Sequence, residues 1–384
     1  MLNPSTARRI YLDFNASTPI APEVANAMRG VLAEPFGNPS SEHWAGERAK
    51  RAIEKARAQV AALLECRPNE IVFTSGGSES NNHALKGLFF AKETTKAHFI
   101  TTQVEHPSVI NPCRFLERLG ATATYLPVDG FGRVDPDDVR RAITPETILI
   151  SVMHANNEVG TIQPILDIVR IAHEHGILFH TDAAQSVGKV ATRTDELGVD
   201  LLSVAGHKLY GPKGVGALFV REHVRLEPLI HGASHELGRR AGTESVLLDV
   251  GLGAACATAQ SWLGMKSARQ LRDLFWNLLQ DAFGDQVALN GHPTERLPNT
   301  LNVSVIGKAG SEILDRVENV AASTGSACHS GSLELSPVLK AMKIPPHIGM
   351  GAIRFSLGRT TTREEIESTV ALLTKAVAQS HALA

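Results

Sequence analysis

Hydrophobic positions recur at helical spacing over residues 40–64. Apolar side chains fall three or four residues apart, with charged residues on the other side, at Ala49, Ile53, Ala56, Val60 and Leu63. A stripe of this kind buries one face of a helix and leaves the opposite face to water. The pattern therefore predicts an amphipathic helix that packs on a larger body.

The next part of the chain alternates short apolar runs with helical stretches. The runs are the candidate strands Ile71–Thr74, His98–Thr102, Ala123–Pro127, Thr147–Val152, Ile177–Thr181 and Leu201–Val204. Strands that alternate with helices of roughly 10 to 15 residues are typical of βαβ units around a mostly parallel sheet. The predicted fold class is α/β.

The pattern changes near Glu244. Two long helical stretches cover residues 245–262 and 267–283, and strand candidates follow at Asn299–Val305 and Ala352–Leu357 before a last helix from Thr362. Helices followed by separate strands favour a smaller α+β domain after roughly residue 260.

Composition limits the partners. The chain has 384 residues, enough for about two domains, and its net charge of −2 gives no electrostatic reason to bind nucleic acid or a membrane surface. The N-terminus lacks an apolar segment of signal-peptide length, so we expect a cytoplasmic protein. Four scattered cysteines (66, 113, 256 and 328) predict reduced thiols rather than a disulfide framework.

The segment "GHKLYGPKGVG", residues 206–216, has two chemical interpretations. Its glycines could form a phosphate-binding loop around Lys213, or Lys208 could itself be the reactive group. A Walker loop places lysine directly after the last glycine of G-x-x-x-x-G-K-[ST], with a hydroxyl residue next. This segment has neither feature, which favours Lys208.

Upstream residues support that choice. Apolar runs lead into Asp182, with Gln185 three residues later, and into Lys208. Ligand sites of α/β proteins lie at the carboxyl ends of parallel strands, so the carboxylate and the amine should meet in one crevice. A lysine for the Schiff base and an acid for the pyridine nitrogen suit pyridoxal phosphate.

A phosphate group needs backbone donors at a helix N-terminus. The segment "IVFTSGGSESNN" offers a strand, a glycine turn at Gly76–Gly77, and then Ser78 at the start of a helix. The alternative is an ordinary turn with a serine that caps the helix. The segment alone leaves both open.

The chain resembles the pyridoxal-phosphate-dependent cysteine desulfurases of the NifS/IscS type, within the class V aminotransferases and close to the selenocysteine lyases. The resemblance runs through ordered segments over nearly the whole chain: "YLDFNASTP", "FGNPSSEHWAG", "FTSGGSESNN", "VEHPSV", "MHANNEVGTIQP", "HTDAAQSVGK", "GHKLYGPKGVGAL", "RRAGTES", "GSACHS" and "IRFSLGRTT". It implies a fold-type I transferase, with a large cofactor-binding domain at residues 16–260. Residues 1–15 and 261–384 would form the small domain that carries the catalytic cysteine loop.

The resemblance assigns cofactor contacts. Lys208 would form the Schiff base, Asp182 would hold the pyridine nitrogen, and Gln185 would donate to the phenolic oxygen. His106 would stack on the ring and handle protons, although a histidine before Pro107 could instead simply cap a helix. Residues expected around the phosphate are Gly77, Ser78 and His207. Ala205 stands where the family usually has a serine, so one phosphate donor is lost or replaced.

Further roles concern the substrate and a second subunit. Asn157 would contact both the phenolic oxygen and the substrate carboxylate, which Arg354 would hold bidentately. Thr243 would reach the phosphate of the other subunit, which implies a homodimer with a shared active site. Cys328 would be the nucleophile. His235 replaces a glutamine usual before that threonine.

The implied reaction converts L-cysteine to L-alanine and leaves a persulfide on Cys328 for a sulfur-acceptor protein, as in iron–sulfur cluster assembly. Cys66, Cys113 and Cys256 lie in or beside helical runs and are interpreted as packing residues. No histidine pair shows metal-ligand spacing such as H-E-x-x-H. A selenocysteine lyase and a catalytically idle sulfur-transfer scaffold stay open as alternatives, although the presence of Lys208, Asp182 and Cys328 argues against the scaffold.

Overall fold

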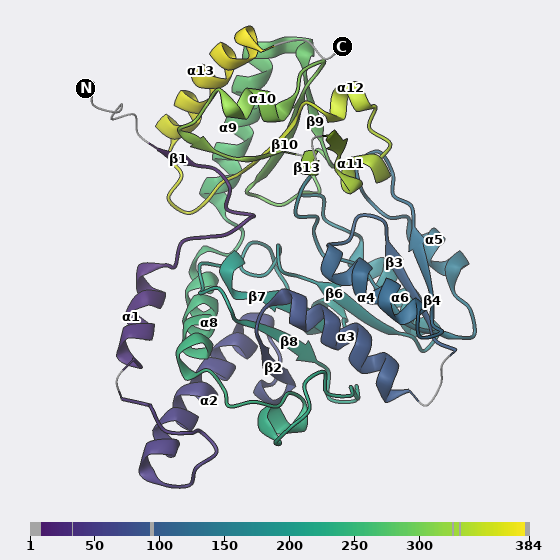
Figure 1. The fold of residues 1–384 in the computed structure, drawn as a ribbon, viewed down its shortest axis with the longest axis vertical. Coiled ribbons are helices and arrows are strands. Elements are labelled where there is room, and N and C mark those ends of the chain that lie inside the picture. The colour runs from purple at the N-terminus through teal and green to yellow at the C-terminus, as the bar shows by residue number, and fades with distance from the viewer. Residues whose placement is uncertain (1–8, 33, 93–95, 325, 330–331, 381–384) are drawn as a thin grey trace.

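The structure is a computed structural model that describes residues 9–32, 34–92, 96–324, 326–329 and 332–380. Its larger part is built on a seven-stranded sheet of order β2-β8-β7-β6-β5-β3-β4 (Figure 1). The strands are β2 (Ile71–Thr74), β3 (His98–Thr102), β4 (Thr122–Leu126), β5 (Thr147–Ser151), β6 (Leu178–Asp182), β7 (Leu201–Ala205) and β8 (Gly216–Val220). The five strands β4, β3, β5, β6 and β7 are parallel, and β8 is antiparallel to both of its neighbours.

Helices cover both faces of this sheet, which explains why every residue of β2, β3, β7 and β8 is buried. Val72 faces a core with α3 (Gly77–Ala91) and α4 (Pro107–Glu117). Ile71 and Phe73 face the opposite core with α2 (Trp44–Leu64), α6 (Ile165–Glu174) and α8 (Val246–Ala259). The remaining helices of this part are α1 (Pro22–Gly30), α5 (Pro136–Ala142) and α7 (Thr194–Leu197).

A second, smaller sheet has the order β12-β15-β10-β9. Its strands β9 (Val287–Asn290), β10 (Thr300–Val305), β12 (Ser323–Thr324) and β15 (Ala352–Ser356) pair antiparallel. Its core is separate from those of the large sheet and includes residues of α9 (Lys266–Phe283), α10 (Gly310–Asp315) and α13 (Arg363–Gln379). Ile10 and Leu12 join this core from the N-terminal segment, where β1 (Ile10–Tyr11) pairs with β11 (Val320–Ala321).

Between β12 and β15, the chain forms a hairpin. Strands β13 (Ser326–His329) and β14 (Ser332–Leu335) pair antiparallel, with Cys328 opposite Leu333. Helices α11 (Pro337–Ala341) and α12 (Pro346–Gly349) follow. The side chain of Cys328 lies outside the part of the chain that the structure describes in full.

The predicted α/β fold is confirmed, and the predicted strands agree with the observed ones to within one or two residues. The sequence analysis missed β8, which begins at a glycine and follows a glycine-rich turn. The division at residues 15 and 260 stays a prediction.

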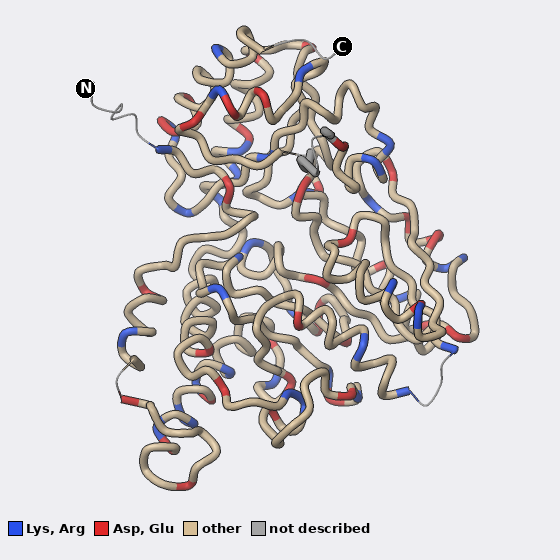
Figure 2. Tube along the Cα trace, in the orientation of Figure 1, with Lys and Arg blue, Asp and Glu red and all other residues tan. Residues whose placement is uncertain are grey.

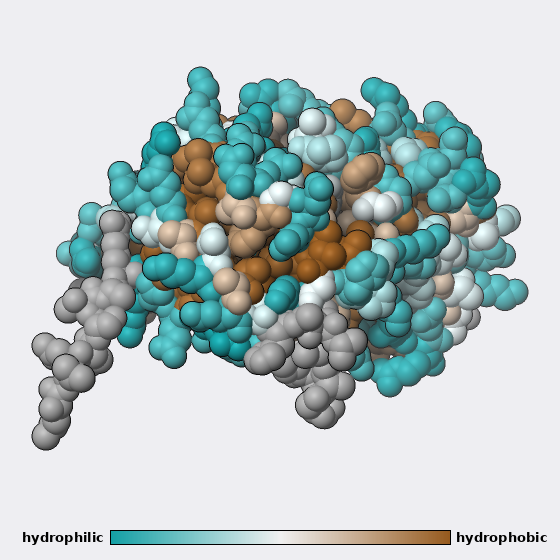
Figure 3. Space-filling model, turned by 90° about the horizontal axis from the view of Figure 1, so that it is seen from above, coloured by the Kyte–Doolittle hydropathy of each residue, from teal (hydrophilic) through white to brown (hydrophobic). Residues whose placement is uncertain are grey.

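Charged and hydrophobic residues are distributed over the whole protein. Basic and acidic residues are interspersed along the trace (Figure 2), and hydrophobic residues on the face seen from above lie between hydrophilic ones (Figure 3). Among the described residues, no single helix could cross a membrane by length and composition, and only α8 and α9 with their short extensions, a pair bent by 69°, would pass together.

Candidate active site

A cavity of about 500 Å³ lies at the carboxyl ends of the central parallel strands. Its lining includes most of the residues that the sequence analysis selected, namely Gly77, Ser78, His106, Asn157, Asp182, Gln185, His207, Lys208 and Arg354. These residues come from segments spread over nearly 280 positions, so only the fold brings them together. Their assigned roles stay predictions, whereas their convergence on one cavity is observed.

Lys208 ends a short 3₁₀ turn, η2 (Gly206–Lys208), directly after β7. Its Nζ donates to the backbone carbonyls of Asn15 and Ala16, both at 2.8 Å. Burial and, to a smaller extent, the positive charge of Arg354 lower the pKa of Lys208 to about 8 against the opposing charges of Asp182 and Asp13. An amine with this pKa is partly deprotonated near neutral pH, as a nucleophile for a carbonyl group must be.

Asp182 is the last residue of β6, and both of its carboxylate oxygens are held. Oδ1 accepts from the backbone N–H of Ala184 at 2.9 Å, and Oδ2 accepts from Nδ2 of Asn81 at 2.7 Å. Asn81 also donates to the hydroxyl of Ser108 at 2.8 Å. The sequence analysis missed Asn81, although its position four residues after Gly77 places it one helical turn further along α3.

The N-terminus of α3 forms another wall. Gly76 precedes it with φ +147°, a conformation that favours glycine, and a Cβ added at Gly77 would lie 3.3 Å from Cβ of Ala205. Gly76 is the N-cap, without a side-chain cap bond among the described residues, so the alternative of a serine-capped turn is wrong. Backbone N–H groups at this end of a 15-residue helix suit an anion.

His207 and Ala205 flank the same end of the cavity. Burial, followed by the charges of Lys208 and Lys213, lowers the pKa of His207 to about 4. A neutral imidazole can still donate one hydrogen bond to an anionic oxygen. Ala205 contributes no hydroxyl, as expected from the sequence.

His106 has the local role that its position before Pro107 suggested. Its Nδ1 accepts from the backbone N–H of Ser108 at 3.2 Å and contacts the Ser108 hydroxyl at 2.7 Å, so it is the N-cap of α4. It also lines the cavity. Burial lowers the pKa of His106, while the charge of Asp182 opposes this and that of Lys208 adds to it. The helix-cap interpretation and the active-site interpretation are therefore compatible.

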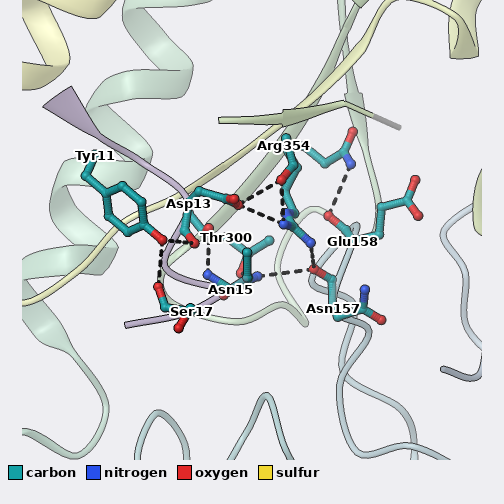
Figure 4. A network of polar contacts seen from close by, with 12 residues as sticks. Tyr11, Asp13, Asn15, Ser17, Asn157, Glu158, Thr300 and Arg354 are labelled. Atoms are coloured by element: carbon teal, nitrogen blue, oxygen red, sulfur yellow. Dashed lines mark hydrogen bonds and ion pairs between the residues drawn. The ribbon is translucent and has the colours of Figure 1, made fainter. Parts of the chain in front are cut away.

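Arg354 lies in the middle of β15 and points toward the N-terminal segment (Figure 4). Nη2 donates to Oδ1 of Asp13 at 2.8 Å and to the hydroxyl of Ser323 at 2.9 Å, and Nη1 donates to the carbonyl of Asn157 at 2.9 Å. Asp13 supplies the negative charge that a nearly buried arginine needs. The sequence analysis missed Asp13, because it lies 341 residues away from Arg354 along the chain.

Asn15 connects the two sheets. Its Nδ2 donates to the Thr300 hydroxyl at 2.8 Å and to the carbonyl of Asn157 at 3.3 Å. Figure 4 shows Asn15 between Thr300 and Asn157. Because the carbonyl of Asn15 also accepts from Nζ of Lys208, the N-terminal segment contacts both Lys208 and Asn157.

A second cavity, of about 460 Å³, shares His106 and Asn157 with the first. Glu158 lines it and accepts from the Ser336 hydroxyl at 2.5 Å. Burial raises the pKa of Glu158 to about 7, against a hydrogen bond from Ser336 and the charge of Arg354. Ser336 caps α11 directly after the β13–β14 hairpin, so this contact fixes the end of the segment that carries Cys328.

Thr243 is not among the residues that line the large cavity. It is exposed and lines a smaller cavity of about 80 Å³ that shares Ser75 and Gly214 with the large one. His235, which replaces the usual glutamine, accepts from the backbone N–H of Gly242 at 3.2 Å. The contact shows that His235 shapes the loop that presents Thr243.

Three of the cysteines are placed as the sequence analysis expected. Cys113 and Cys256 are buried and Cys66 is partly buried, as expected for packing residues. Within the described ranges, no group of three or more metal-ligating side chains is suitably placed for a metal ion.

The match to known families decides the relationship. The description "Aminotransferase class-V" applies to the family model that matches residues 10–369. The chain belongs to this family. The resemblance inferred from the sequence is thereby confirmed.

Individual relatives narrow the comparison. The cysteine desulfurase IscS of Dictyoglomus turgidum is 49% identical over 374 residues, which are 96% of this chain and 95% of that protein. A solved NifS-like protein has a TM-score of 0.89 at 34% identity and covers 97% of this chain and 100% of its own. The structure of SspA in complex with cysteine has a TM-score of 0.80 at 40% identity, covering 91% of this chain and 98% of its own.

Proposed function

We propose that this protein is a cysteine desulfurase that uses pyridoxal phosphate and transfers sulfur from L-cysteine to Cys328. The observation that carries the proposal is the convergence of Lys208, Asp182 and Arg354 on one cavity. An amine, a fixed carboxylate and a guanidinium are the groups that this cofactor and an amino acid substrate require. Relatives that carry the name cysteine desulfurase support the reaction.

The residues of the cavity fit the cofactor. The N-terminus of α3, with Gly77 and Ser78, and His207 would hold the phosphate. Asp182 would hold the pyridine nitrogen, His106 would cover the ring, and Gln185 with Asn157 would face the phenolic oxygen. When bound, pyridoxal phosphate supplies an electron sink that stabilises a carbanion at the substrate α-carbon.

The chain's own groups would position the substrate and move its protons. Arg354, held by Asp13 and Asn157, would bind the α-carboxylate and thereby fix the α-carbon above the cavity floor. Lys208, with a pKa lowered to about 8, can accept and return a proton near neutral pH. His106, whose pKa is also lowered, would be neutral beside it; because its Nδ1 accepts from the N–H of Ser108, its Nε2 carries the proton and can donate it to a group in the cavity.

The sulfur step balances without a further oxidant or reductant. The Cys328 sulfur attacks the substrate sulfur, the carbon–sulfur bond breaks and a sulfur–sulfur bond forms. The β-carbon takes up a proton and becomes the methyl group of alanine. Because an ordinary thiol has a pKa near 8.5, deprotonation of Cys328 by a neighbouring base would raise the fraction of reactive thiolate.

The proposal includes a homodimer with shared active sites. Thr243 is exposed beside, but not in, the large cavity, which is the arrangement expected if it serves a neighbouring subunit. Large hydrophobic side chains are exposed on the same part of the protein that carries α1, α2 and the Thr243 loop, at Leu32, Phe36, Trp44 and Leu237. A second subunit would bury such side chains.

Subunit mixing tests the shared site. A Lys208→Ala subunit and a Thr243→Asp subunit are each expected to be inactive alone, because one lacks the amine and the other repels the phosphate. A mixed dimer regains one complete site, so activity should return partly after co-refolding. Inactivity of verified mixed dimers would contradict the shared site.

Alanine release tests the reaction itself. The purified protein should form alanine from L-cysteine, and mass spectrometry should find an added sulfur on the peptide with Cys328. Cys328→Ala should form no alanine from cysteine. A protein inert toward cysteine but active on selenocysteine would be a lyase instead, and inertness toward both would indicate a scaffold.

The proposal also includes a protein as sulfur acceptor and a cytoplasmic location. A persulfide on a β-hairpin suits transfer to a protein thiol, and such chemistry requires reduced cysteines. The described cysteines are free, which supports a cytoplasmic location. Incubation with cysteine and candidate acceptor proteins, followed by persulfide labelling, would identify the acceptor.

A further inference from the structure

We infer that Lys189 is a positioning residue that sets the orientation of the Gln185 carboxamide toward the cofactor. The inference rests on the proposed use of pyridoxal phosphate. It concerns a buried lysine that the mechanism above does not use and that lies behind the wall of the cavity.

The contacts of Lys189 single it out. It is only 5% exposed, and its Nζ donates to Oε1 of Gln185 at 2.9 Å and to Oδ1 of Asn15 at 3.0 Å. Gln185 lines the large cavity, whereas Lys189 is not among its lining residues. Buried lysines are rare unless they satisfy specific partners, so this one needs an explanation.

The two ends of a carboxamide have nearly the same shape but opposite hydrogen-bonding character. Lys189 donates an N–H to Gln185, so the carboxamide oxygen faces Lys189. The Nε2 group then faces the other way and donates to the carbonyl of Asn15 at 3.0 Å. A flipped carboxamide would place the Gln185 oxygen against the carbonyl oxygen of Asn15, and the Gln185 N–H groups against the N–H groups of Lys189.

The position of Nε2 gives this orientation its functional meaning. The Asn15 carbonyl that accepts from Gln185 also accepts from Nζ of Lys208 at 2.8 Å. The N–H end of Gln185 therefore lies beside the amine that would hold the cofactor. A donor here favours the ionised phenolic oxygen, whereas a carboxamide oxygen would repel it.

The charge of Lys189 affects one of the two contacts that orient Gln185. Burial lowers the pKa of Lys189 well below its ordinary value, and the charges of Lys208 and Arg354 add to this effect. A neutral amine keeps two N–H groups, one for Gln185 and one for Asn15, but it also has a lone pair that a flipped carboxamide could use. The Asn15 carbonyl is an acceptor at every pH, so it still disfavours the flipped orientation.

Lys189→Met tests the inference, because it keeps the length of the side chain and removes its donors. After this change Oδ1 of Asn15 still accepts from Nδ2 of Asn299 at 3.2 Å, whereas Oε1 of Gln185 loses Lys189. The effect should therefore fall on Gln185. Lys375→Met, at an exposed position of α13, is the matched control.

The readout is the pH midpoint of the visible absorption of the full-length holoenzyme, together with the rate of cofactor loss on dilution. Lys189→Met should raise the midpoint by about half to one pH unit and speed cofactor loss about tenfold, the size of one hydrogen bond. Gln185→Met should act in the same direction. The double variant Lys189→Met/Gln185→Met should equal Gln185→Met alone, because Lys189 would act only through Gln185.

Two outcomes would overturn the inference: an unchanged midpoint in Lys189→Met, or an effect of Lys189→Met that persists in the Gln185→Met background. If Lys189→Met fails to fold, the double variant Lys189→Met/Gln185→Met should fold again, because it no longer contains the Gln185 oxygen that lost its donor. Failure of both variants to fold would show that Lys189 acts through Asn15 instead. A wild-type protein that binds no pyridoxal phosphate would contradict the proposed function, a result distinct from all of these.

Discussion

The two sheets supply the candidate active site in different ways. The large sheet presents Asp182 and Lys208 from the residues that end or follow its parallel strands, where the backbone turns away and side chains are free to converge. The small sheet presents Arg354 from the middle of a strand. A side chain in that position must be held by partners from other segments.

The partners differ accordingly. Asp182 is held by Asn81 and Ala184, both from segments that pack directly on the large sheet. Arg354 is held by Asp13 and by the carbonyl of Asn157, which come from the N-terminal segment and from a loop of the large sheet. The cofactor end of the site should therefore be locally rigid, whereas the substrate end depends on how the two sheets are joined.

Replacement of the amine should have the largest effect. Lys208→Ala removes the group proposed to hold the cofactor and move the substrate proton, so turnover should fall at least about 10³-fold. Alanine release under single-turnover conditions measures it. Borohydride reduction and peptide mapping of the wild type should place the cofactor on Lys208, and a label on Lys213 would contradict the assignment.

At the substrate end, Arg354→Lys should chiefly weaken binding. A lysine keeps the charge but cannot make two parallel hydrogen bonds to a carboxylate, so KM for cysteine should rise about 10- to 100-fold with a smaller change in kcat. Initial rates over a range of cysteine concentrations separate the two constants. A fall in kcat at unchanged KM would place Arg354 in the chemical step instead.

A buried acid, Glu105, lies in the loop after β3 of the large sheet. Oε1 of Glu105 accepts from the Thr102 hydroxyl at 2.8 Å and from the backbone N–H of Met153 at 2.9 Å. Burial raises the pKa of Glu105 from its ordinary value of 4.5 to about 8. The folded state therefore binds this proton more tightly than the unfolded chain, and the stability that it contributes below pH 4.5 is lost as pH rises toward 8.

Glu105→Gln removes that titration. Relative to the wild type, its free energy of unfolding should rise between pH 5 and pH 9 by about 4 kcal/mol. Urea unfolding at a series of pH values measures the difference. Glu117→Gln, at the end of α4, is a surface control that should show a flat difference. A flat difference for Glu105→Gln as well would mean that Glu105 is ionised in the folded state.

The smallest effect is expected at Asn81. Asn81→Ala removes one donor to Asp182 but leaves the N–H of Ala184 in place, so kcat should fall about tenfold. Asn82→Ala is the matched control, because Nδ2 of Asn82 donates to the Ser78 carbonyl within α3 and, in the described ranges, makes no hydrogen bond to Asp182. Equal losses in both variants would point to a general weakening of the helix rather than to the Asp182 contact.

The sequence alone determined six of the seven strands of the large sheet and the groups at their ends. Helices cover both faces of that sheet, so its central strands are rich in apolar residues, and a polar residue after such a run is visible in the sequence, as at Asp182 and Lys208. Arg354 was also recognisable, since arginine inside an apolar strand needs an anionic partner. β8 was missed because it begins within a glycine-rich stretch.

The partners of those groups were decided by tertiary structure. Asp13, Asn15 and Asn81 are ordinary polar residues in the sequence, and their importance comes from contacts with residues 101 to 341 positions away. Lys189 contacts Gln185 four residues away, but its burial and its contact with Asn15, 174 residues away, depend on the fold. Local propensity and periodicity describe neighbours along the chain, so they carry no information about such contacts. The candidate groups Asp182, Lys208 and Arg354 could thus be recognised from their neighbours along the sequence. The orientation of these groups depends on packing between distant segments, because only the folded chain brings their hydrogen-bond partners within 3 Å.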